Sequence, residues 1–542
     1  RTSSASPGAS PEISIRGTSS ITGSNDPLIV IDGFPGGDLQ SLNSGDIESI
    51  EILKDASSAA IYGSRAAGGV IIVTTKMGKN EKPTFSFNTF TGIKTPAYLY
   101  DDILNTEEAY AYDLKRNDVD WIQSGGDPTV PVEDRPDDYQ PDARRLDYAD
   151  TDWQDEVLQD GLITNYELSA RGGSDALKYY ISGNYLNEEG THVVGDFQKY
   201  SIRANFRSKF SDKFNMGLNL YTAYTDQRRH TQNMRNAIKY PPSIPMFLPE
   251  GETAFGSNYA YNRYYFDNGT SGTNPVAESV GSFDYYKKLT TQANLFLELK
   301  IADGFAFKTS VGVRYKNNKN PYFRATYANK TGLTQADYQY SDNMNILNEN
   351  ILTYSKTFAS KHEFNALLGA SYQMDNEFNT YSEVIEGSIP DNKIQTLNAG
   401  IASLATTFEE QWGLVSYFSR INYGYKNKYL ISASYRVDGS SKFGSDTKWG
   451  SFPSISMGWN VHKEDFFDNV PVVSKLKVRA SFGVTGRTSR QNYPSFSRIQ
   501  SQNYTFGNSV VNGATQGTFG NSELGWEQTE EINLGLNISL FK

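Results

Sequence analysis

Alternation of apolar and polar residues dominates the chain from Pro83 onward. The pattern recurs in about fourteen segments of roughly ten residues, which is about the length with which a tilted strand crosses a bilayer. In one of them, 201–210, Ile202 and Ala204 flank Arg203. Successive side chains of a strand point to opposite faces, so the pattern predicts strands with one apolar and one polar face. No run of 18 apolar residues occurs, and no transmembrane helix is predicted.

Short and long connections alternate between these segments. The short ones are "GGSDA" (172–176), "SDK" (211–213), "ADG" (302–304) and "YGYKNK" (423–428). The long ones are 95–160, 187–199, 227–287, 317–345, 376–405, 438–451 and 486–524, with one of medium length at 462–474. Outer-membrane barrels have short turns at one end and long loops at the other. A soluble β-sandwich has no reason to collect its long loops at one end, so the pattern favours a membrane barrel.

The polar stripe of the predicted strands is rich in cations, namely Arg203, Arg207, Lys209, Lys308, Arg314, Lys477 and Arg479. In a soluble sandwich this stripe faces outside water, whereas in a wide barrel it faces the lumen and the apolar stripe faces lipid. At any one strand the sequence leaves both possibilities open. If the apolar stripe faces lipid, Ile202→Arg or Phe206→Arg should cost about 2–4 kcal/mol near the bilayer midplane, and Arg203→Ala much less.

Before the alternating region, the sequence predicts a small αβ unit. Its elements are strands at 28–31 and 50–53, a helix at 56–62 and a strand at 70–75. We expect Asp55 to cap the helix and Gly63 to end it with positive φ. Gly68 and Gly69 would let two backbone segments approach closely.

Composition and motifs exclude several kinds of chemistry. The 542 residues include no cysteine, so there are no disulfides, and the net charge of −11 argues against nucleic acid as a partner. The four histidines lack metal-ligand spacing, and the acidic stretch "DYADTDWQDE" (147–156) lacks the spacing of a calcium loop. With no nucleophile elbow and no phosphate loop, we expect no catalytic residues, no metal and no cofactor.

Several long motifs point to one family. The N-terminal ones are "IRGTSS" (15–20), "PLIVIDG" (27–33) and "DIESIEILKDASSAAIYGSRAAGGVIIVTTK" (46–76); later ones are "TDWQDEVL" (151–158), "SYRVDGSSKFGSDTKWGSFPSISMGW" (434–459), "LKVRASFGVTG" (476–486) and "NSELGWEQTEEINLGL" (521–536). The first three resemble the plug of TonB-dependent outer-membrane receptors of the SusC/RagA-like branch, and the others resemble its barrel. The departures are small: Gly68 stands where asparagine is usual, and Arg487 follows "VTG". The resemblance assigns a plug motif to Arg16, Gly17, Asp32, Gly33, Glu51, Lys54, Asp55, Tyr62, Gly63, Gly68 and Gly69.

The resemblance implies a fold and a location. The fold would be an all-β transmembrane antiparallel barrel, with about 14 of the family's roughly 22 strands, and a small αβ plug at its N-terminal side. We expect the C-terminal part of the plug domain in residues 1–79 and the N-terminal part of the barrel in 80–542. The sequence would then be a fragment that lacks both ends of a protein in the Gram-negative outer membrane.

The resemblance also implies a function without covalent chemistry. A bulky nutrient, in the first place an oligosaccharide or other glycan and in the second place a peptide, would be imported with energy from a TonB–ExbB–ExbD complex and with a SusD-like surface lipoprotein, while the barrel contacts outer-membrane lipid. Two alternatives stay open: a siderophore or vitamin receptor of the same family, and a soluble glycan-binding or adhesive β-protein. Tyrosines in the long loops are candidate substrate or partner contacts, and packing among the loops is the other explanation for them. They are Tyr98, Tyr100, Tyr261, Tyr264 and Tyr265.

Overall fold

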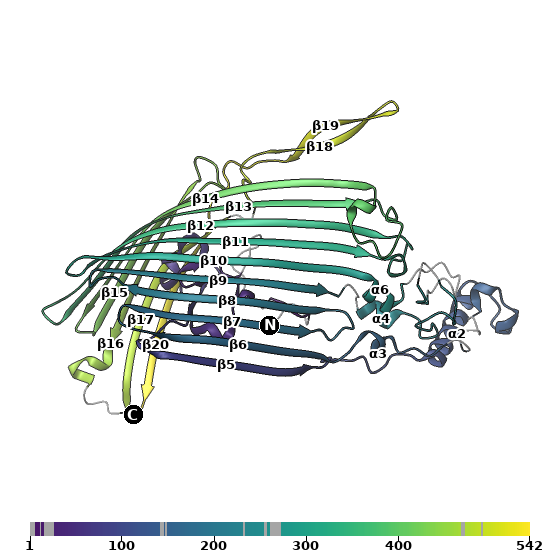
Figure 1. Ribbon diagram of the computed structural model, residues 1–542, viewed down its shortest axis with the longest axis horizontal. Helices are drawn as coiled ribbons and strands as arrows, with labels where there is room; N and C mark the ends of the chain where they lie inside the picture. Colours follow the sequence, from purple (N-terminus) through teal and green to yellow (C-terminus); the bar gives the residue numbers. More distant parts are fainter. Residues whose placement is uncertain are drawn as a thin grey trace.

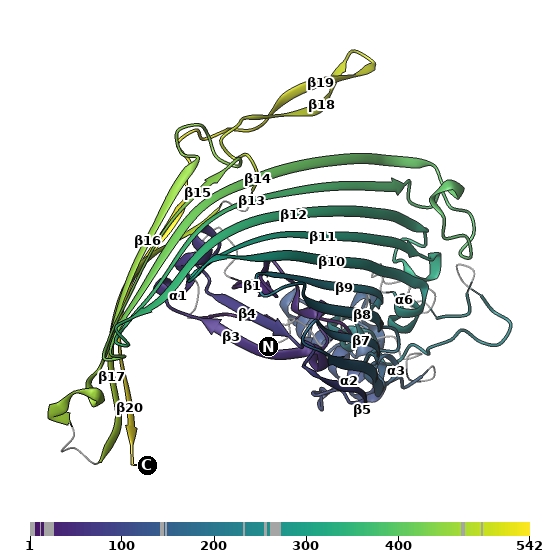
Figure 2. The same ribbon diagram turned by 60° about the vertical axis from the view of Figure 1, so that its left-hand side comes forward.

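A computed structural model describes most of the chain, namely residues 6–10, 12–15, 26–140, 146, 149–230, 234–253, 257–260, 273–467, 472–488 and 491–541. An antiparallel sheet of 14 strands curves around a small four-stranded sheet near the N-terminus, as Figures 1 and 2 show. This arrangement confirms the predicted fold class, a partial barrel with an αβ plug. Among the described residues, no helix has the length and apolar character needed to cross a bilayer.

The plug has a mixed sheet with the strand order β2-β1-β4-β3. The strands are β1 (Leu28–Ile31), β2 (Phe34–Pro35), β3 (Ile47–Leu53) and β4 (Val70–Thr75), and the helical turns are η1 (Leu39–Ser41), η2 (Ser44–Asp46), α1 (Ala56–Ala59) and η3 (Ala60–Arg65). Two small apolar clusters cover this sheet, one built around Val30 and Val70 and the other around Ile31 and Val73. The plug therefore has a hydrophobic core of its own.

The large sheet, which we call the wall, is built from consecutive antiparallel strands and has β5 and β20 at its edges. Its strands are β5 (Glu81–Lys94), β6 (Gly161–Gly173), β7 (Leu177–Glu189), β8 (Asp196–Lys209), β9 (Phe214–Arg229), β10 (Ser282–Ala302), β11 (Phe305–Arg324), β12 (Gln335–Phe358), β13 (His362–Val384), β14 (Ala402–Tyr425), β15 (Tyr429–Ser440), β16 (Trp449–Asn460), β17 (Val473–Arg487) and β20 (Glu527–Leu540). The connection from β17 to β20 contains a separate hairpin, β18 (Arg498–Phe506) and β19 (Ser509–Thr518). This hairpin extends away from the wall (Figure 1).

The strands are longer than predicted, between 12 residues in β15 and 24 in β12 and β14. The ladder between β12 and β13 continues without interruption from Phe358 to Asp337. The upper part of β12 keeps an alternating pattern, with Ala336, Tyr338 and Tyr340 on one face and polar residues on the other, but polar residues are so frequent there that the sequence predicts a loop. Three predicted long connections are therefore much shorter in the structure: 187–199, 317–345 and 376–405 become 190–195, 325–334 and 385–401.

Helices and apolar clusters gather in the long connections at one end of the wall. The helical segments there are α2 (Thr106–Gln123), η4 (Val132–Asp134), η5 (Asp137–Tyr139), α3 (Trp153–Val157), α4 (Met234–Lys239), α6 (Pro275–Gly281), η7 (Thr326–Ala328) and η8 (Leu397–Ala399). Trp153, Val157 and Ile244 belong to one cluster that joins the connections 95–160 and 230–281. The opposite end has tight turns and the segment with η9 (Val461–Lys463) and η10 (Asp465–Phe467).

Burial in the wall is reversed relative to a soluble protein. Ile202 is 57% exposed on the outer face, whereas its neighbour Arg203 is only 2% exposed and faces the plug. Aromatic residues gather on the outer face at two heights. The upper girdle contains Tyr166, Tyr185, Tyr200, Tyr224, Tyr372, Tyr417 and Trp449, and the lower one Phe210, Phe214, Phe305, Tyr354, Phe364, Tyr423, Tyr429 and Trp459. Paired aromatic girdles mark the two interfaces of a membrane-spanning barrel.

Candidate functional site

The plug meets the wall through polar side chains at two main places. At the first wall contact, the plug carboxylate of Asp46 accepts hydrogen bonds from the Tyr180 hydroxyl at 2.9 Å and from the Ser182 hydroxyl at 2.6 Å. The guanidinium of Arg203 lies 3.3 Å from Asp46 and 3.6 Å from Asp32. All five side chains are shielded from solvent, and one wall cation lies between two plug carboxylates.

The local sequence of the plug explains why Asp32 points toward Arg203. Asp32 and Gly33 both have positive φ, at 49° and 87°, and form the tight turn between β1 and β2. Such turns favour an aspartate followed by glycine. The Asp32 carboxylate accepts hydrogen bonds from the backbone N–H and the hydroxyl of Thr75, at 2.9 and 2.7 Å. These bonds fix its orientation at the end of the plug sheet.

The second wall contact joins the turn 61–64 of the plug to β15. Arg436 donates to the carbonyl of Ile61 at 2.6 Å and to its neighbour Asp438 at 2.7 Å. The Asp438 carboxylate also accepts the backbone N–H of Ser64 at 3.0 Å. Gly63 in this turn has φ 54° and ψ −118°, which confirms the predicted positive φ. A Cβ at Gly63 would lie 2.3 Å from Arg436, so glycine is also required for the close approach.

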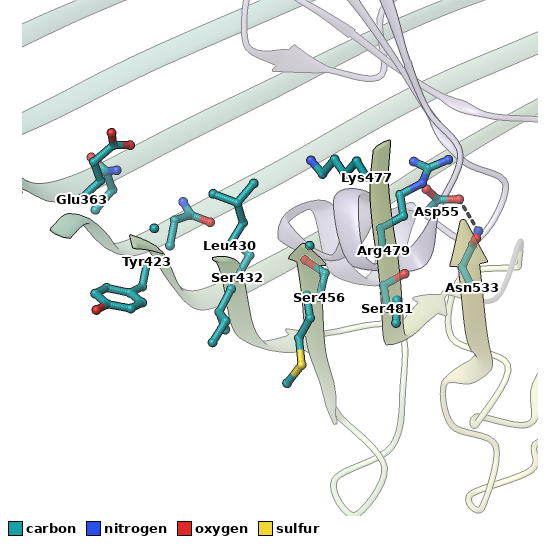
Figure 3. A pocket seen from close by; sticks show the side chains of 17 residues that line it. Asp55, Glu363, Tyr423, Leu430, Ser432, Ser456, Lys477, Arg479, Ser481 and Asn533 are labelled. Carbon is teal, nitrogen blue, oxygen red and sulfur yellow. Dashed lines mark hydrogen bonds between the residues drawn. The ribbon is translucent and has the colours of Figure 1, made fainter. Parts of the chain in front are cut away.

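A polar cavity of about 310 Å³ lies between α1 and the wall near the tight turns. Figure 3 shows Asp55 of the plug pointing toward Asn533 of β20, with Lys477 and Arg479 beside them. The Asp55 carboxylate accepts a hydrogen bond from the Asn533 amide at 2.6 Å. Asp55 occupies the N-cap position of α1, but it makes no side-chain cap hydrogen bond, so the predicted capping role is wrong. Its carboxylate faces the wall instead.

A second cavity of about 450 Å³ lies at the opposite end, below the long connections. The plug contributes Asp38 and Gln40, and the wall contributes Arg229, Tyr286 and Lys288. Lys288 forms a salt bridge of 2.6 Å with Asp38. Burial alone would raise the pKa of Asp38, but the nearby ammonium of Lys288 holds this pKa below its ordinary value. The cavity thus offers a cation, an anion and an aromatic ring to a polar ligand.

The remaining predicted plug residues have varied surroundings. Glu51 and Lys54 are exposed on and just after β3. Tyr62 packs on the Val30 cluster, and burial raises the pKa of its hydroxyl. Gly68 precedes β4 beside Gly69, which has φ 86° and approaches the carbonyl of Leu53. Arg16 and Gly17 lie outside the described residues.

Of the predicted loop tyrosines, two can be placed. Tyr98 and Tyr100 are 74% and 49% exposed, and their rings meet edge to face at 5.3 Å. The backbone N–H of Tyr100 donates to the side chain of Gln154 in α3, which holds this part of the long connection against the loop helices. Tyr261, Tyr264 and Tyr265 lie outside the described residues.

Sequence reasoning missed Asp46, Asp38, Arg436 and Asp438 as interface residues. Arg436 and Asp438 alternate with Tyr435 and Val437 in the sequence, and this alternation is the signal that could have placed them on the inner face. Which cation meets which plug carboxylate depends on the depth at which the plug sits, and no local pattern encodes that depth. Among the described residues, no cluster of histidines and carboxylates could hold a metal ion.

Comparisons with known proteins agree with this architecture. The profile described as "TonB-dependent Receptor Plug Domain" matches residues 1–70, and the profile "TonB dependent receptor-like, beta-barrel" matches 249–542. The chain is 32% identical over 549 residues to TonB-dependent receptor P3 of Formosa agariphila, with 99% of this chain and 51% of that protein covered. It is 30% identical over 575 residues to TonB-dependent receptor SusC of Bacteroides thetaiotaomicron, with 98% and 53% covered. The chain thus spans about half the length of these relatives.

Solved structures give the same picture. The RagAB peptide transporter superposes with a TM-score of 0.82 at 25% identity, over 100% of this chain and 62% of that chain. The siderophore receptor PirA from Acinetobacter baumannii superposes with a TM-score of 0.53 at 14% identity, over 99% and 63%. The second likeness reflects a shared fold alone.

Proposed function

The chain belongs to the TonB-dependent receptor family, and from this premise we propose that the protein imports a bulky nutrient by shifting its plug inside the barrel. It is an outer-membrane receptor of the SusC/RagA type, since SusC and the RagAB transporter both match over nearly the whole chain. The import step, the nutrient and the partners belong to the proposal. The protein would carry the nutrient across without making or breaking a covalent bond in it.

The observation that carries the proposal is the polar character of the contact between plug and wall. Each of the four hydrophobic clusters formed by described residues lies within the plug or within the wall and its connections, and none of the four joins the two parts. Water can replace hydrogen bonds and ion pairs when two polar surfaces separate, so their net contribution to holding surfaces together is modest. A plug held in this way can move without exposing a large apolar surface.

The cavity around Asp38 and Lys288 supports the proposal that the nutrient is polar and bulky. Its charged and aromatic side chains suit hydrogen bonding and ring stacking, which both glycans and peptides offer. The cavity lies beneath the long connections 95–160 and 230–281, where a ligand would arrive from outside the cell. We propose an oligosaccharide or a peptide as the nutrient.

Two partners complete the proposal. A TonB–ExbB–ExbD complex would supply the force on the plug, and a SusD-like surface lipoprotein would dock on the long connections 95–160, 230–281 and 488–526. Loops of this length usually have a function of their own. The exposed pair Tyr98 and Tyr100 lies in the first of them.

The direct test is uptake by cells that carry or lack the gene for this protein. Labelled oligosaccharide and peptide mixtures are supplied separately, and the internalised label is measured with and without a functional TonB. We expect one of the two mixtures to enter only when both this protein and TonB are present. Uptake that persists without TonB, or a label that is taken up only as a ferric siderophore or a vitamin, would contradict the proposal.

A further inference from the structure

The outer face of the wall has a groove where β13, β14 and β15 pass the upper aromatic girdle. It has a volume of about 400 Å³. Its lining is mostly apolar, and it includes Tyr372, Met374, Gln411, Gly413, Val415, Gly439, Ser441, Lys448, Trp449 and Tyr493. These side chains point away from the plug, so this groove is separate from both cavities described above.

Glycines at two positions shape the groove: Gly439 lets a tryptophan ring lie flat on the wall, and Gly413 leaves the floor open. Gly413 of β14 pairs with Met374 of β13, and Gly439 of β15 pairs with Trp449 of β16. The ring of Trp449 lies directly on Gly439, where a Cβ would come within 2.7 Å of it. At Gly413 a Cβ would have ordinary contacts at 3.8–4.0 Å, so the space above this residue is open.

One side of the groove is formed by Tyr493, which belongs to the connection after β17. Tyr493 is in the left-handed region with φ 54°, a conformation that is uncommon for a bulky residue. Its hydroxyl donates to the carbonyl of Gln411 and lies 3.4 Å from the hydroxyl of Ser441. Ser441 in turn accepts the backbone N–H of Gly413 at 2.9 Å. A distant segment is thus fixed as one wall of the groove.

The groove lies at the level where acyl chains meet head groups. Along β13, Tyr372 in the upper girdle is eight residues from Phe364 in the lower girdle. At about 3.4 Å per residue this is about 27 Å along the strand, or about 21 Å across the bilayer for a strand tilted by about 40°, which fits within the apolar band of about 25 Å in outer-membrane barrels. The floor therefore faces hydrocarbon, and the rim faces lipid head groups.

The side chain of Lys448 places a positive charge at this rim. Lys448 is exposed, lines the groove and forms no salt bridge with a described residue. Apolar cavities do not hold water, and the bilayer around the protein supplies acyl chains to fill this one. We propose that the groove binds one lipid of the outer leaflet, with an acyl chain over Gly413 and an anionic phosphate head group against Lys448.

The test uses the protein purified from its own outer membrane in mild detergent and passed through vesicles of phosphatidylcholine with phosphatidylglycerol. Retained lipid is measured by native mass spectrometry for the wild type, Gly413→Leu and Lys448→Gln. Gly183→Leu is the matched control for the first change, because Gly183 is an outward glycine of β7 with open space around it. Lys213→Gln, in the tight turn after β8, is the control for the second.

We expect one phosphatidylglycerol molecule to stay bound to the wild type and to both controls. Gly413→Leu should abolish its retention, and Lys448→Gln should reduce it about fivefold, as expected for one lysine near a membrane surface. Diacylglycerol should bind more weakly than phosphatidylglycerol, and inorganic phosphate alone should not bind. Equal retention in Gly413→Leu and Gly183→Leu, or a second protein copy over the groove in place of lipid, would overturn the proposal.

Discussion

The plug and the wall place their apolar side chains in opposite ways. Val70 and Val73 of the plug are fully buried between its sheet and the segments around it, as in a soluble domain. On β20 of the wall, Ile532 and Leu534 are 77% and 79% exposed, while Arg203 and Asp438 are buried on the inner face. The outer surface of the wall meets lipid and the inner surface meets the plug. The two parts therefore share a largely polar contact, because most of their apolar residues are buried or shielded elsewhere.

The largest expected effect comes from removing the shared cation of the first wall contact. The sequence predicts that Arg203→Ala costs much less than Ile202→Arg, but Arg203 is buried between Asp32 and Asp46. Removing one partner of a buried ion pair costs about 3–5 kcal/mol, because the other charge stays buried. We expect a loss of this size in the free energy that holds the plug in the barrel, measured by limited proteolysis of the plug in increasing urea.

The control for this change is Lys209→Ala on the same strand. Lys209 pairs with Asp212 at the exposed end of β8, and such solvent-exposed pairs contribute little to stability. If both variants release the plug at the same urea concentration, the first wall contact does not hold the plug.

The next effect concerns the lipid side of the same strand. Ile202→Arg should destabilise the folded barrel by about 2–4 kcal/mol, because it places a charge against hydrocarbon. Ile202→Leu keeps the apolar surface and should leave stability unchanged. The stability of both variants is measured by electrophoresis of unheated samples, in which the folded barrel migrates differently from the unfolded chain. Equal stability of the two would mean that this face of β8 does not meet lipid.

A smaller effect is expected at the second wall contact. Gly63→Val introduces backbone strain of about 1–3 kcal/mol at positive φ and pushes against Arg436. Gly33→Ala is a useful comparison, because a Cβ at Gly33 meets nothing within 4 Å although its φ is also positive. The proteolysis assay should show earlier plug release for Gly63→Val than for Gly33→Ala. The reverse order would contradict the contact between this turn and β15.

The smallest effect on stability is expected in the long connections. Tyr98→Ala with Tyr100→Ala should change the unfolding free energy by less than about 0.5 kcal/mol, because both side chains are exposed. The double variant should nevertheless lose the co-purifying lipoprotein. Tyr112→Ala, an equally exposed tyrosine of α2, is the control that should keep it. Retention of the lipoprotein by the double variant would place the docking surface elsewhere.

The sequence predicted the features that depend on local patterns. The alternation around Ile202 and Arg203 gave the strands and their two faces, and "AIYGSR" gave the positive φ of Gly63. The predicted strands were too short above the membrane, where β12 and β13 are rich in polar residues and tyrosine. The pairing of Arg203 with Asp46 joins residues 157 positions apart and depends on the depth of the plug. The division into 1–79 and 80–542 stays a prediction.

The most direct test of the account is to tie the plug to the wall and measure import. The Thr75 hydroxyl of the plug lies 2.8 Å from the Asn205 amide of β8, and the 542 residues contain no other cysteine with which engineered thiols could react. Thr75→Cys and Asn205→Cys are combined and joined by a short, reducible thiol cross-linker. The account predicts that the joined protein imports no nutrient, that reduction restores import, and that each single variant imports normally. Import by the joined protein at the wild-type rate would contradict a plug that moves away from β8.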